Sequence, residues 1–184
     1  MLNTLAYCID FIERINNFIG KAVSWLTLGC VLNCFLVVIL RYIFSTGYPW
    51  MQELYVWQHS VVFLGGAGFT LLHQGHVKVD IAYNRFSPKI QCWVDIIGTI
   101  IFTIPWMVIL TLTSFSFITA SWAIYEPSPQ TNGMQGFFLL KTMIWFFTFT
   151  VTLQGVALIG KKIIFLSNET ESYSRQTKQK EDHL

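Results

Sequence analysis

The residues in this sequence best suited to chemistry are its four histidines, which can bind haem iron or carry protons near neutral pH. His59, His73 and His76 lie close together in the chain, and His183 lies near its end. A bis-histidine haem between membrane helices needs histidines that face each other from neighbouring helices. Because three of the four belong to one segment, a b-type haem protein is the least favoured function for this chain.

The other polar groups in the apolar parts of the chain are neutral. Asn33, Gln154 and the hydroxyls between residues 111 and 121 could line a path for a substrate, but such groups also bond to carbonyls one turn earlier or to neighbouring helices. Membrane transporters place ionisable groups along their substrate path, and His59 is the one titratable candidate at such a depth. The motifs of phosphate loops, zinc proteases and serine hydrolases are absent. We therefore predict no enzyme, no metal site and no cofactor in this chain.

The elements that must carry these residues are four long apolar runs. The 184 residues are 53% hydrophobic and 12% charged, and the charged residues lie mostly between the runs. A membrane-crossing helix needs about 20 apolar residues, and one Asp, Lys or Arg at its centre costs at least ~2.5 kcal/mol. The sequence predicts an all-α membrane protein in which residues 21–166 form four transmembrane helices. These cover about residues 22–43, 50–72, 92–124 and 138–162.

The third of these runs is longer than a bilayer requires. About thirty uncharged residues extend roughly 45 Å as a helix, whereas the hydrocarbon core is roughly 30 Å thick. The helix must therefore tilt or project from the membrane. Pro105 lies within the run and removes one backbone donor. We expect a kink at this proline.

The two ends of the chain differ from the spans. Residues 1–20 have apolar residues at helical spacing, among them Ile9 and Ile12, while Asp10, Glu13 and Asn16 fall on the other side. This pattern predicts an amphipathic helix in the membrane interface, with a plain extension of the first span as the alternative. Residues 167–184 are polar and mixed in charge, which predicts a disordered tail.

The distribution of lysine and arginine predicts the orientation. Of the 12 such residues, only Arg41 and Lys141 lie in the first and third loops. The other ten lie in the N-terminal segment, the middle loop and the tail. Since cytoplasmic segments carry the excess of positive charge, both termini and the middle loop are predicted to be cytoplasmic. The net charge of +2 is too small to indicate a nucleic-acid partner.

Several short segments carry a resemblance to a known family. They are YPWMQEL at 48–54, GHVKVD at 75–80, FSP at 86–88, EPS at 126–128 and LQG at 153–155. In their order and spacing, together with four spans and cytoplasmic ends, they resemble the small membrane subunit, the DctQ type, of tripartite ATP-independent periplasmic (TRAP) transporters. The resemblance covers roughly residues 15–165. Gln52 departs from the pattern, because many relatives carry a second acid there.

The resemblance implies a bacterial inner-membrane complex with two other proteins. A large membrane subunit would hold the substrate and sodium sites, and a periplasmic binding protein would deliver an organic acid. The small subunit would brace the large one, offer part of the docking surface and bind no cofactor itself. The main alternative is a carrier that works alone, which would have to build its own site near the middle of the membrane.

Three groups of residues are the candidates for these roles. The residues proposed to contact the large subunit or the binding protein are Trp50, Gln52, Glu53, Glu126 and Ser128. Those proposed to pack helices closely are Gly65, Gly66, Gly68, Gln154 and Gly155. His76 and Asp80 mark the cytoplasmic loop. For Glu53 a second interpretation stays open, since a carboxylate in a first helical turn also stabilises the positive end of the helix dipole.

Overall fold

The structure is a computed structural model that describes residues 2–75, 83 and 85–181, with side chains described between residues 4 and 167. All regular secondary structure in these ranges is helical, as the apolar runs predict. The helices are α1 (Leu2–Tyr42), α2 (Pro49–Gly65), α3 (Ala67–Leu72), α5 (Pro88–Gly98), the π-helix η1 (Thr99–Thr103), α6 (Ile104–Ala123) and α7 (Phe137–Glu181).

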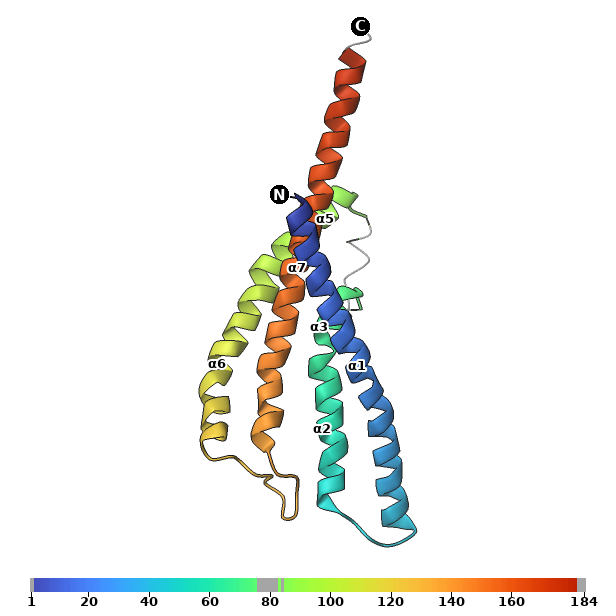
Figure 1. Ribbon diagram of the computed structural model, residues 1–184, viewed down its shortest axis with the longest axis vertical. Coiled ribbons are helices and arrows are strands. Elements are labelled where there is room, and N and C mark those ends of the chain that lie inside the picture. The colour runs from blue at the N-terminus through green and yellow to red at the C-terminus, as the bar shows by residue number, and fades with distance from the viewer. Residues whose placement is uncertain (1, 76–82, 84, 182–184) are drawn as a thin grey trace.

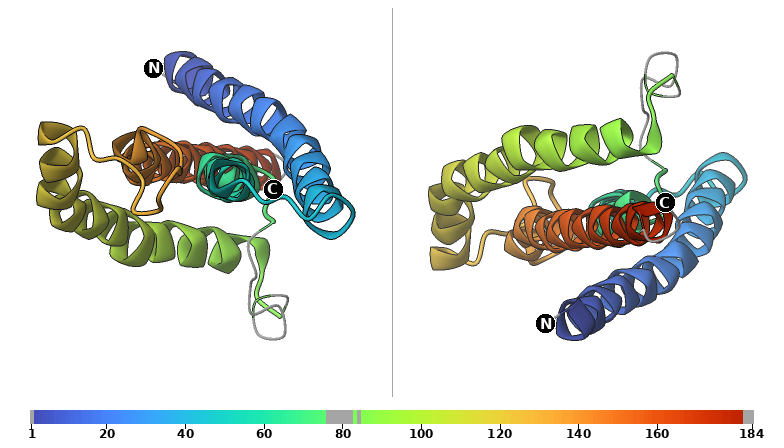
Figure 2. Two further views of the ribbon diagram at one scale, coloured as in Figure 1. Left: turned by 90° about the horizontal axis from the view of Figure 1, so that it is seen from below. Right: turned by 90° about the horizontal axis from the view of Figure 1, so that it is seen from above.

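The helices run along one long axis (Figure 1). Helices α2, α3 and α7 lie in the middle, with α1 on one side and α5, η1 and α6 on the other (Figure 2). Both termini lie at one end of the molecule, which we name the terminal end. The loops 43–48 and 124–136 lie at the opposite end, which we name the loop end (Figure 1).

Three stretches are long and apolar enough to cross a membrane, namely Thr4–Tyr42, Pro88–Ala123 and Phe137–Ser167. The run predicted as the second span, 50–72, is divided at Gly66 into α2 and α3, and neither part alone has that length. Helical hydrogen bonds nevertheless continue through the division. The amide of Gly66 donates to the carbonyl of Val62, and the amide of Thr70 donates to the carbonyl of Gly66, both at 2.9 Å.

Helix α1 joins two predicted elements without interruption. The sequence predicts an interfacial helix over residues 1–20 and a span from residue 22, but α1 is continuous from Leu2 to Tyr42. At 1.5 Å per residue, the 39 residues of Thr4–Tyr42 extend about 58 Å, more than the 40–45 Å of a whole bilayer. Part of α1 must therefore lie outside the hydrocarbon core. The interfacial position of residues 1–20 stays a prediction.

The third predicted span contains a π-helix directly before its proline. In η1 the amide of Ile104 donates to the carbonyl of Thr99, five residues earlier, instead of to the carbonyl four residues earlier. Pro105 occupies the first turn of α6 and has no backbone donor, so the α-helical bond to the carbonyl of residue 101 cannot form. The disturbance that Pro105 predicts takes the form of this π-turn.

The last helix continues beyond the predicted fourth span. Figure 1 shows the C-terminal part of α7 projecting away from the other helices. The helix reaches Glu181, within the stretch 167–184 that the sequence predicts to be disordered. Disorder of this tail stays a prediction.

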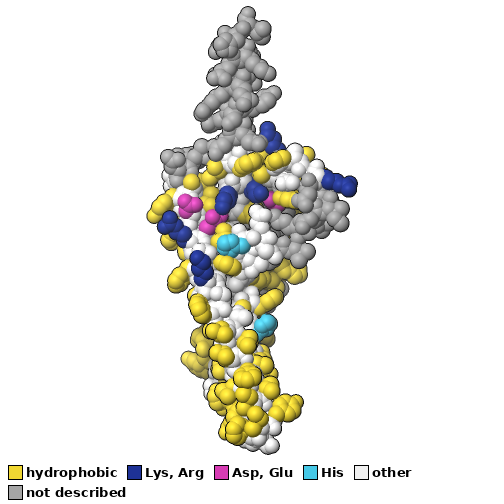
Figure 3. Space-filling model, turned by 90° about the vertical axis from the view of Figure 1, so that its right-hand side faces the viewer, with side chains coloured by type: hydrophobic (Ala, Val, Ile, Leu, Met, Phe, Trp, Pro, Cys, Tyr) yellow, Lys and Arg dark blue, Asp and Glu magenta, His cyan; other side chains and the backbone are white. Residues whose placement is uncertain are grey.

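The surface is divided by charge along the long axis. On the face drawn in Figure 3, the charged side chains gather toward the terminal end, and hydrophobic side chains cover the rest down to the loop end. Many large apolar residues are exposed on α1 and on η1 and α6, including Trp25, Phe35, Ile101 and Leu112. A water-soluble protein rarely leaves an apolar surface of this extent uncovered. The arrangement is that of a protein surrounded by lipid.

Candidate functional site: polar clusters at the two ends

The carboxylate of Glu53 lies at the loop end and holds the loop between α6 and α7. Glu53 is the fifth residue of α2, beyond the first turn where the helix-dipole interpretation places it, and it is only 9% exposed. One of its oxygens accepts a hydrogen bond from the hydroxyl of Ser128. The other accepts a bond of 2.6 Å from the backbone amide of Met134. Because both oxygens bind the same loop, Glu53 fixes it against the start of α2.

The loop itself is shaped to approach this carboxylate. Asn132 has φ +59°, a left-handed conformation that Asn tolerates better than most residues. Gly133 follows, and a Cβ there would lie 2.6 Å from Oε2 of Glu53 and 2.3 Å from the hydroxyl of Ser128. Glycine is therefore required at position 133. The amide of Gln130 donates to the same hydroxyl at 3.0 Å, which completes the cluster.

The second acid at the loop end, Glu126, lies in the loop itself and has a different partner. It forms an ion pair with Lys141 at the start of α7. The Lys141 ammonium also lies 4.1 Å from the centre of the Phe117 ring, a cation–π distance. The hydrogen bond from Lys141 lowers the pKa of Glu126. Glu126 therefore stays ionised at neutral pH and ties the end of α6 to α7.

The predicted contact residues thus divide into two sets. Glu53 and Ser128 are in direct contact, and Gln52 lines a pocket beside them with Pro129 and Phe137. Trp50, in contrast, is 45% exposed, and its ring lies 6.4 Å from that of Tyr48. The exposed aromatic pair is available to another protein, whereas Glu53 is occupied within the chain.

A buried amide pair joins α1 to α7 nearer the terminal end. The side-chain amide of Asn16 donates to Oε1 of Gln154 at 2.9 Å, and these residues are only 1% and 2% exposed. Gly68 of α3 lies against them, because a Cβ at this position would be 2.6 Å from Oδ1 of Asn16 and 3.1 Å from Cβ of Thr150. Gly68 thereby lets α3 pass close to both α1 and α7.

This placement corrects one sequence interpretation. The amphipathic pattern puts Asn16 on the polar face of an interfacial helix, but in the structure it is among the most buried residues. The buried face of α1 follows a helical stripe instead. It includes Ile9, which contacts Gly160, and Gly20, where a Cβ would lie 2.1 Å from the Phe69 ring. The signal present in the sequence is the i, i+4 spacing of Asn16 and Gly20, two residues suited to close helix contact.

Two of the other predicted packing glycines, Gly65 and Gly155, have milder contacts. A Cβ at Gly65 would lie 3.3 Å from Val23, and one at Gly155 would lie 3.2 Å from Thr99. At Gly66 the nearest atom would be the carbonyl oxygen of Val62, at 2.7 Å. Gly65, Gly68 and Gly155 therefore face neighbouring helices, while Gly66 marks the division between α2 and α3.

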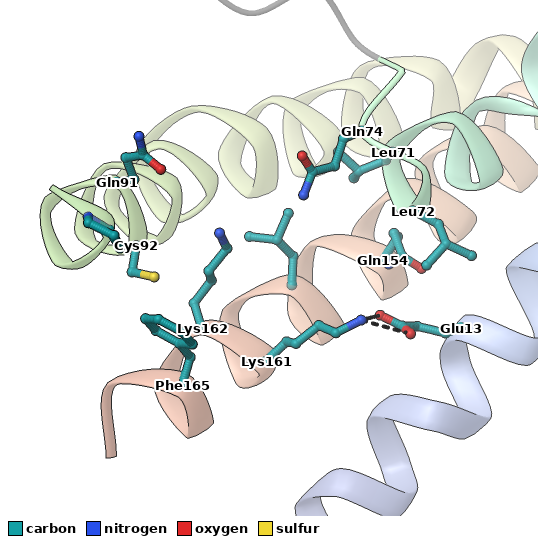
Figure 4. Close-up of a pocket in the computed structure, with 12 residues that line it drawn as sticks. Glu13, Leu71, Leu72, Gln74, Gln91, Cys92, Gln154, Lys161, Lys162 and Phe165 are labelled. Carbon is teal, nitrogen blue, oxygen red and sulfur yellow. Dashed lines mark hydrogen bonds and ion pairs between the residues drawn. The ribbon is translucent and has the colours of Figure 1, made fainter. Parts of the chain in front are cut away.

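Two ion pairs connect α7 to its neighbours at the terminal end. Lys161 contacts both carboxylate oxygens of Glu13 on α1, at 2.8 and 3.1 Å (Figure 4). Lys162, the next residue, contacts Asp95 on α5 at 2.8 Å. The hydroxyl of Tyr83 donates to the same Asp95 oxygen at 2.8 Å. Burial, and then this bond, raise the pKa of Tyr83, so the phenol remains a donor at neutral pH.

The described histidines on α2 and after α3, His59 and His73, contact other residue types. His59 is exposed on α2 and lies beside the Phe63 ring at 6.4 Å. His73 contacts Asn17 at 3.4 Å and the Phe69 ring at 4.3 Å. The described part of the chain has no group of three or more His, Cys, Asp or Glu residues arranged to hold a metal ion. His76 and Asp80 lie outside the described residues.

Sequence reasoning missed one charged residue of the loop end. In the sequence Lys141 marks only the boundary of the fourth span, yet in the structure it is the partner of Glu126. The signal present in the sequence is that Lys141 is one of only two positive charges predicted on that side, where Glu126 is one of only two acids. Opposite charges that are isolated in an apolar setting favour pairing.

Comparison with known proteins gives one family. Neither a curated protein nor a solved structure matches the chain. Residues 30–166, about three quarters of the chain, match the model of the family described as tripartite ATP-independent periplasmic transporters, DctQ component. These residues include the whole Glu53 cluster, the Lys141 ion pair and Gln154. The resemblance seen in the loops is therefore confirmed, and this protein belongs to the DctQ family, the small membrane component of TRAP transporters.

Proposed function

We propose that this chain braces a larger membrane subunit in a TRAP complex that takes up an organic acid with sodium. In this proposal the chain crosses the bacterial inner membrane four times, with both termini in the cytoplasm. A periplasmic binding protein delivers the acid, and the sodium and substrate sites belong to the large subunit. The chain itself contributes a rigid surface rather than a transport path.

The observation that carries the proposal is that polar side chains of the helices form hydrogen bonds within the chain. Thr111, Thr113 and Thr119 each donate to a carbonyl four residues earlier in their own helix. Asn33 donates to the carbonyl of Met51 at 3.0 Å, and Asn16 donates to Gln154. These bonds join or stabilise helices, and they use the donors of these side chains within the chain itself. A stand-alone carrier would need such groups to face a shared central cavity.

The proposed topology has a direct test. Reporter fusions after Trp50 and after Gln130 should read periplasmic, and fusions after Asn84 and after Ser167 should read cytoplasmic. Both termini lie at the terminal end, as an even number of crossings requires (Figure 1). A single reversed fusion would exclude the four-span arrangement.

The accessory role is tested by expressing the chain with and without its partners. We expect copurification with a larger membrane protein, and uptake only when that protein and the binding protein are also present. Transport by the purified chain alone in liposomes would replace this proposal with the stand-alone carrier. The carboxylate class is tested in the same assay by competition with unlabelled organic acids and by replacing sodium with potassium.

The docking role is assigned to the exposed aromatic pair at the loop end. We expect Trp50→Ala to leave assembly normal and to reduce uptake that depends on the binding protein, because an exposed Trp often contributes strongly to a protein contact. The matched control is Trp25→Ala, since Trp25 is also exposed but lies in the middle of α1. Equal uptake in both variants would remove Trp50 from the docking surface.

A further inference from the structure

A groove runs along α7 from the terminal end toward the middle of the molecule. The part nearer the middle of the molecule is a cavity of about 450 Å³ lined mainly by apolar residues of η1, α6 and α7. Its outer part is a cavity of about 390 Å³ that contains charged and amide side chains (Figure 4). Leu71 of α3 lines both cavities, and their lining residues follow one another along α7, so the two cavities adjoin.

One face of α7 forms the floor of this groove. The floor residues recur at intervals of three and four, as a single helix face requires. They are Phe147, Val151, Gln154, Leu158, Lys161 and Phe165. The groove is also open at its side, because Phe102 and Trp106 in the opposite wall are largely exposed.

The groove changes from apolar to charged over the thickness of one lipid leaflet. From Phe147 to Lys161 the helix rises roughly 21 Å, at 1.5 Å per residue. Half of a bilayer, including its headgroup layer, is roughly 20–22 Å thick. An amphiphile of that length can therefore place its chain against Phe147 and Val151 and its headgroup against Lys161.

The charged side chains at the outer end fit a headgroup that carries both a negative and a positive charge. Lys161 and Lys162 supply ammonium donors, and Glu13 supplies a carboxylate (Figure 4). An ammonium has three donors and a carboxylate about four acceptor sites. The existing pairs with Glu13 and Asp95 therefore leave capacity for a further partner. A phosphate suits the two lysines, and a primary ammonium suits Glu13.

We propose that this groove binds one phospholipid with an ethanolamine headgroup from the leaflet at the terminal end. The phosphate lies at Lys161 and Lys162, the ammonium lies at Glu13, and one acyl chain lies between Trp106 and α7. The site rests on the membrane placement proposed above. It does not depend on which acid the complex transports.

The test uses the full chain, in its complex where one forms, reconstituted in discs of equal parts phosphatidylethanolamine, phosphatidylcholine and phosphatidylglycerol. After detergent extraction, native mass spectrometry counts the lipids that remain. We expect one retained phosphatidylethanolamine per chain, with about a tenfold preference over phosphatidylcholine, whose trimethylammonium cannot donate a hydrogen bond to Glu13. Equal retention of the three lipids, or a preference for phosphatidylglycerol, would overturn the proposal.

Three variants locate the site. Leu158→Trp should fill the groove and abolish retention, whereas Val156→Trp, on an exposed face of the same helix, should leave it unchanged. Glu13→Gln should keep the chain folded and remove the preference for ethanolamine over choline. Retention in Leu158→Trp equal to that of the wild type would place the lipid elsewhere.

A photo-crosslinker at position 158 identifies the occupant directly. Attachment to a lipid supports the proposal, and attachment to another protein overturns it. The lipid count does not require uptake, so a failure of this site is distinguishable from a failure of the transport role. The reporter fusions test the membrane placement independently.

Discussion

At the loop end, one carboxylate holds a loop of irregular backbone, whereas nearer the terminal end three helices are held by close contact around a glycine. Glu53 binds Ser128 and the amide of Met134, two groups of one loop. Gly68 lets Asn16, Gln154 and Thr150 meet from two helices. The first cluster depends on hydrogen-bond acceptors, and the second depends on the absence of a side chain.

The two clusters differ because backbone groups in a loop and in a helix have different hydrogen-bond partners. A loop leaves backbone amides without helical partners, and a buried amide without a bond costs about 1–3 kcal/mol. A carboxylate with two oxygens can satisfy such donors. Helices satisfy their own backbone, so their association in lipid depends on packing, to which small residues contribute most. Substitutions at the two ends should therefore destabilise the protein in different ways.

The largest effect is expected for Gly68→Ala. The new Cβ would lie 2.6 Å from Asn16, which is fixed by Gln154, so the helices must shift. We expect a loss of about 1–3 kcal/mol in the free energy of unfolding. Thermal unfolding in detergent measures it. The matched control is Gly98→Ala, because nothing lies within 4 Å of a Cβ at Gly98. Equal stability of the two variants would contradict the contact at Gly68.

The next effect is expected for Glu53→Gln. The amide keeps one acceptor, but its nitrogen would face either the Met134 amide or the Ser128 hydroxyl. We expect a loss of about 1–2 kcal/mol, confined to the loop, because the neutral amide forms weaker hydrogen bonds than the carboxylate, and the Ser128 hydroxyl must accept instead of donate. Hydrogen exchange of the Met134 amide should become faster, while exchange in α1 stays unchanged. Gln52→Ala, one residue earlier, serves as the control.

A smaller effect is expected for the coupling between Asn16 and Gln154. Hydrogen bonds between membrane helices average about 0.6 kcal/mol, with a maximum of about 1.7 kcal/mol. We therefore expect a double-mutant cycle of Asn16→Ala and Gln154→Ala to give a coupling energy in that range. A coupling near zero would mean that the contact at Gly68, and not the amide pair, holds α1 to α7.

The smallest effect is expected from acid at the loop end. The pKa of Glu126 is lowered from its ordinary value of 4.5 by the hydrogen bond from Lys141. A lowered pKa stabilises the folded state above pH 4.5, and this contribution is lost as pH falls through the lower folded pKa. The melting temperature should decline over that range. Glu126→Gln should show a shallower decline, and an identical decline would assign the acid sensitivity to other carboxylates.

The helices were predictable from the sequence because each apolar run is long and bounded by charge. Their finer features depended on contacts that the sequence does not display. The proline at 105 indicates a disturbance, but not that it becomes a π-turn. Gly66 lies in a run of small residues, and nothing local distinguishes it as the place where α2 ends.

The candidate site was predictable in its residues but not in its pairing. Glu53 and Ser128 are both predicted contact residues, yet they are 75 positions apart, and only the fold brings them together. The prediction for Asn16 is wrong because a polar residue in an amphipathic pattern is expected to face water. Its burial depends on Gln154 and Gly68, which come from two other helices.

The π-turn of η1 changes which residues of α6 face the interior of the molecule. Thr99 is buried, and in an unbroken α-helix the residue seven positions later, Trp106, would point the same way. Trp106 is instead 58% exposed, and Met107 is buried at 6%. A π-turn accommodates one additional residue, as an insertion into an α-helix would. Removal of one residue between 100 and 103 should therefore restore α-helical spacing, apart from the bond that Pro105 cannot donate, while Met107, Ile118 and Ser121 keep facing inward. η1 therefore shifts the buried face of α6 by one residue relative to that of α5.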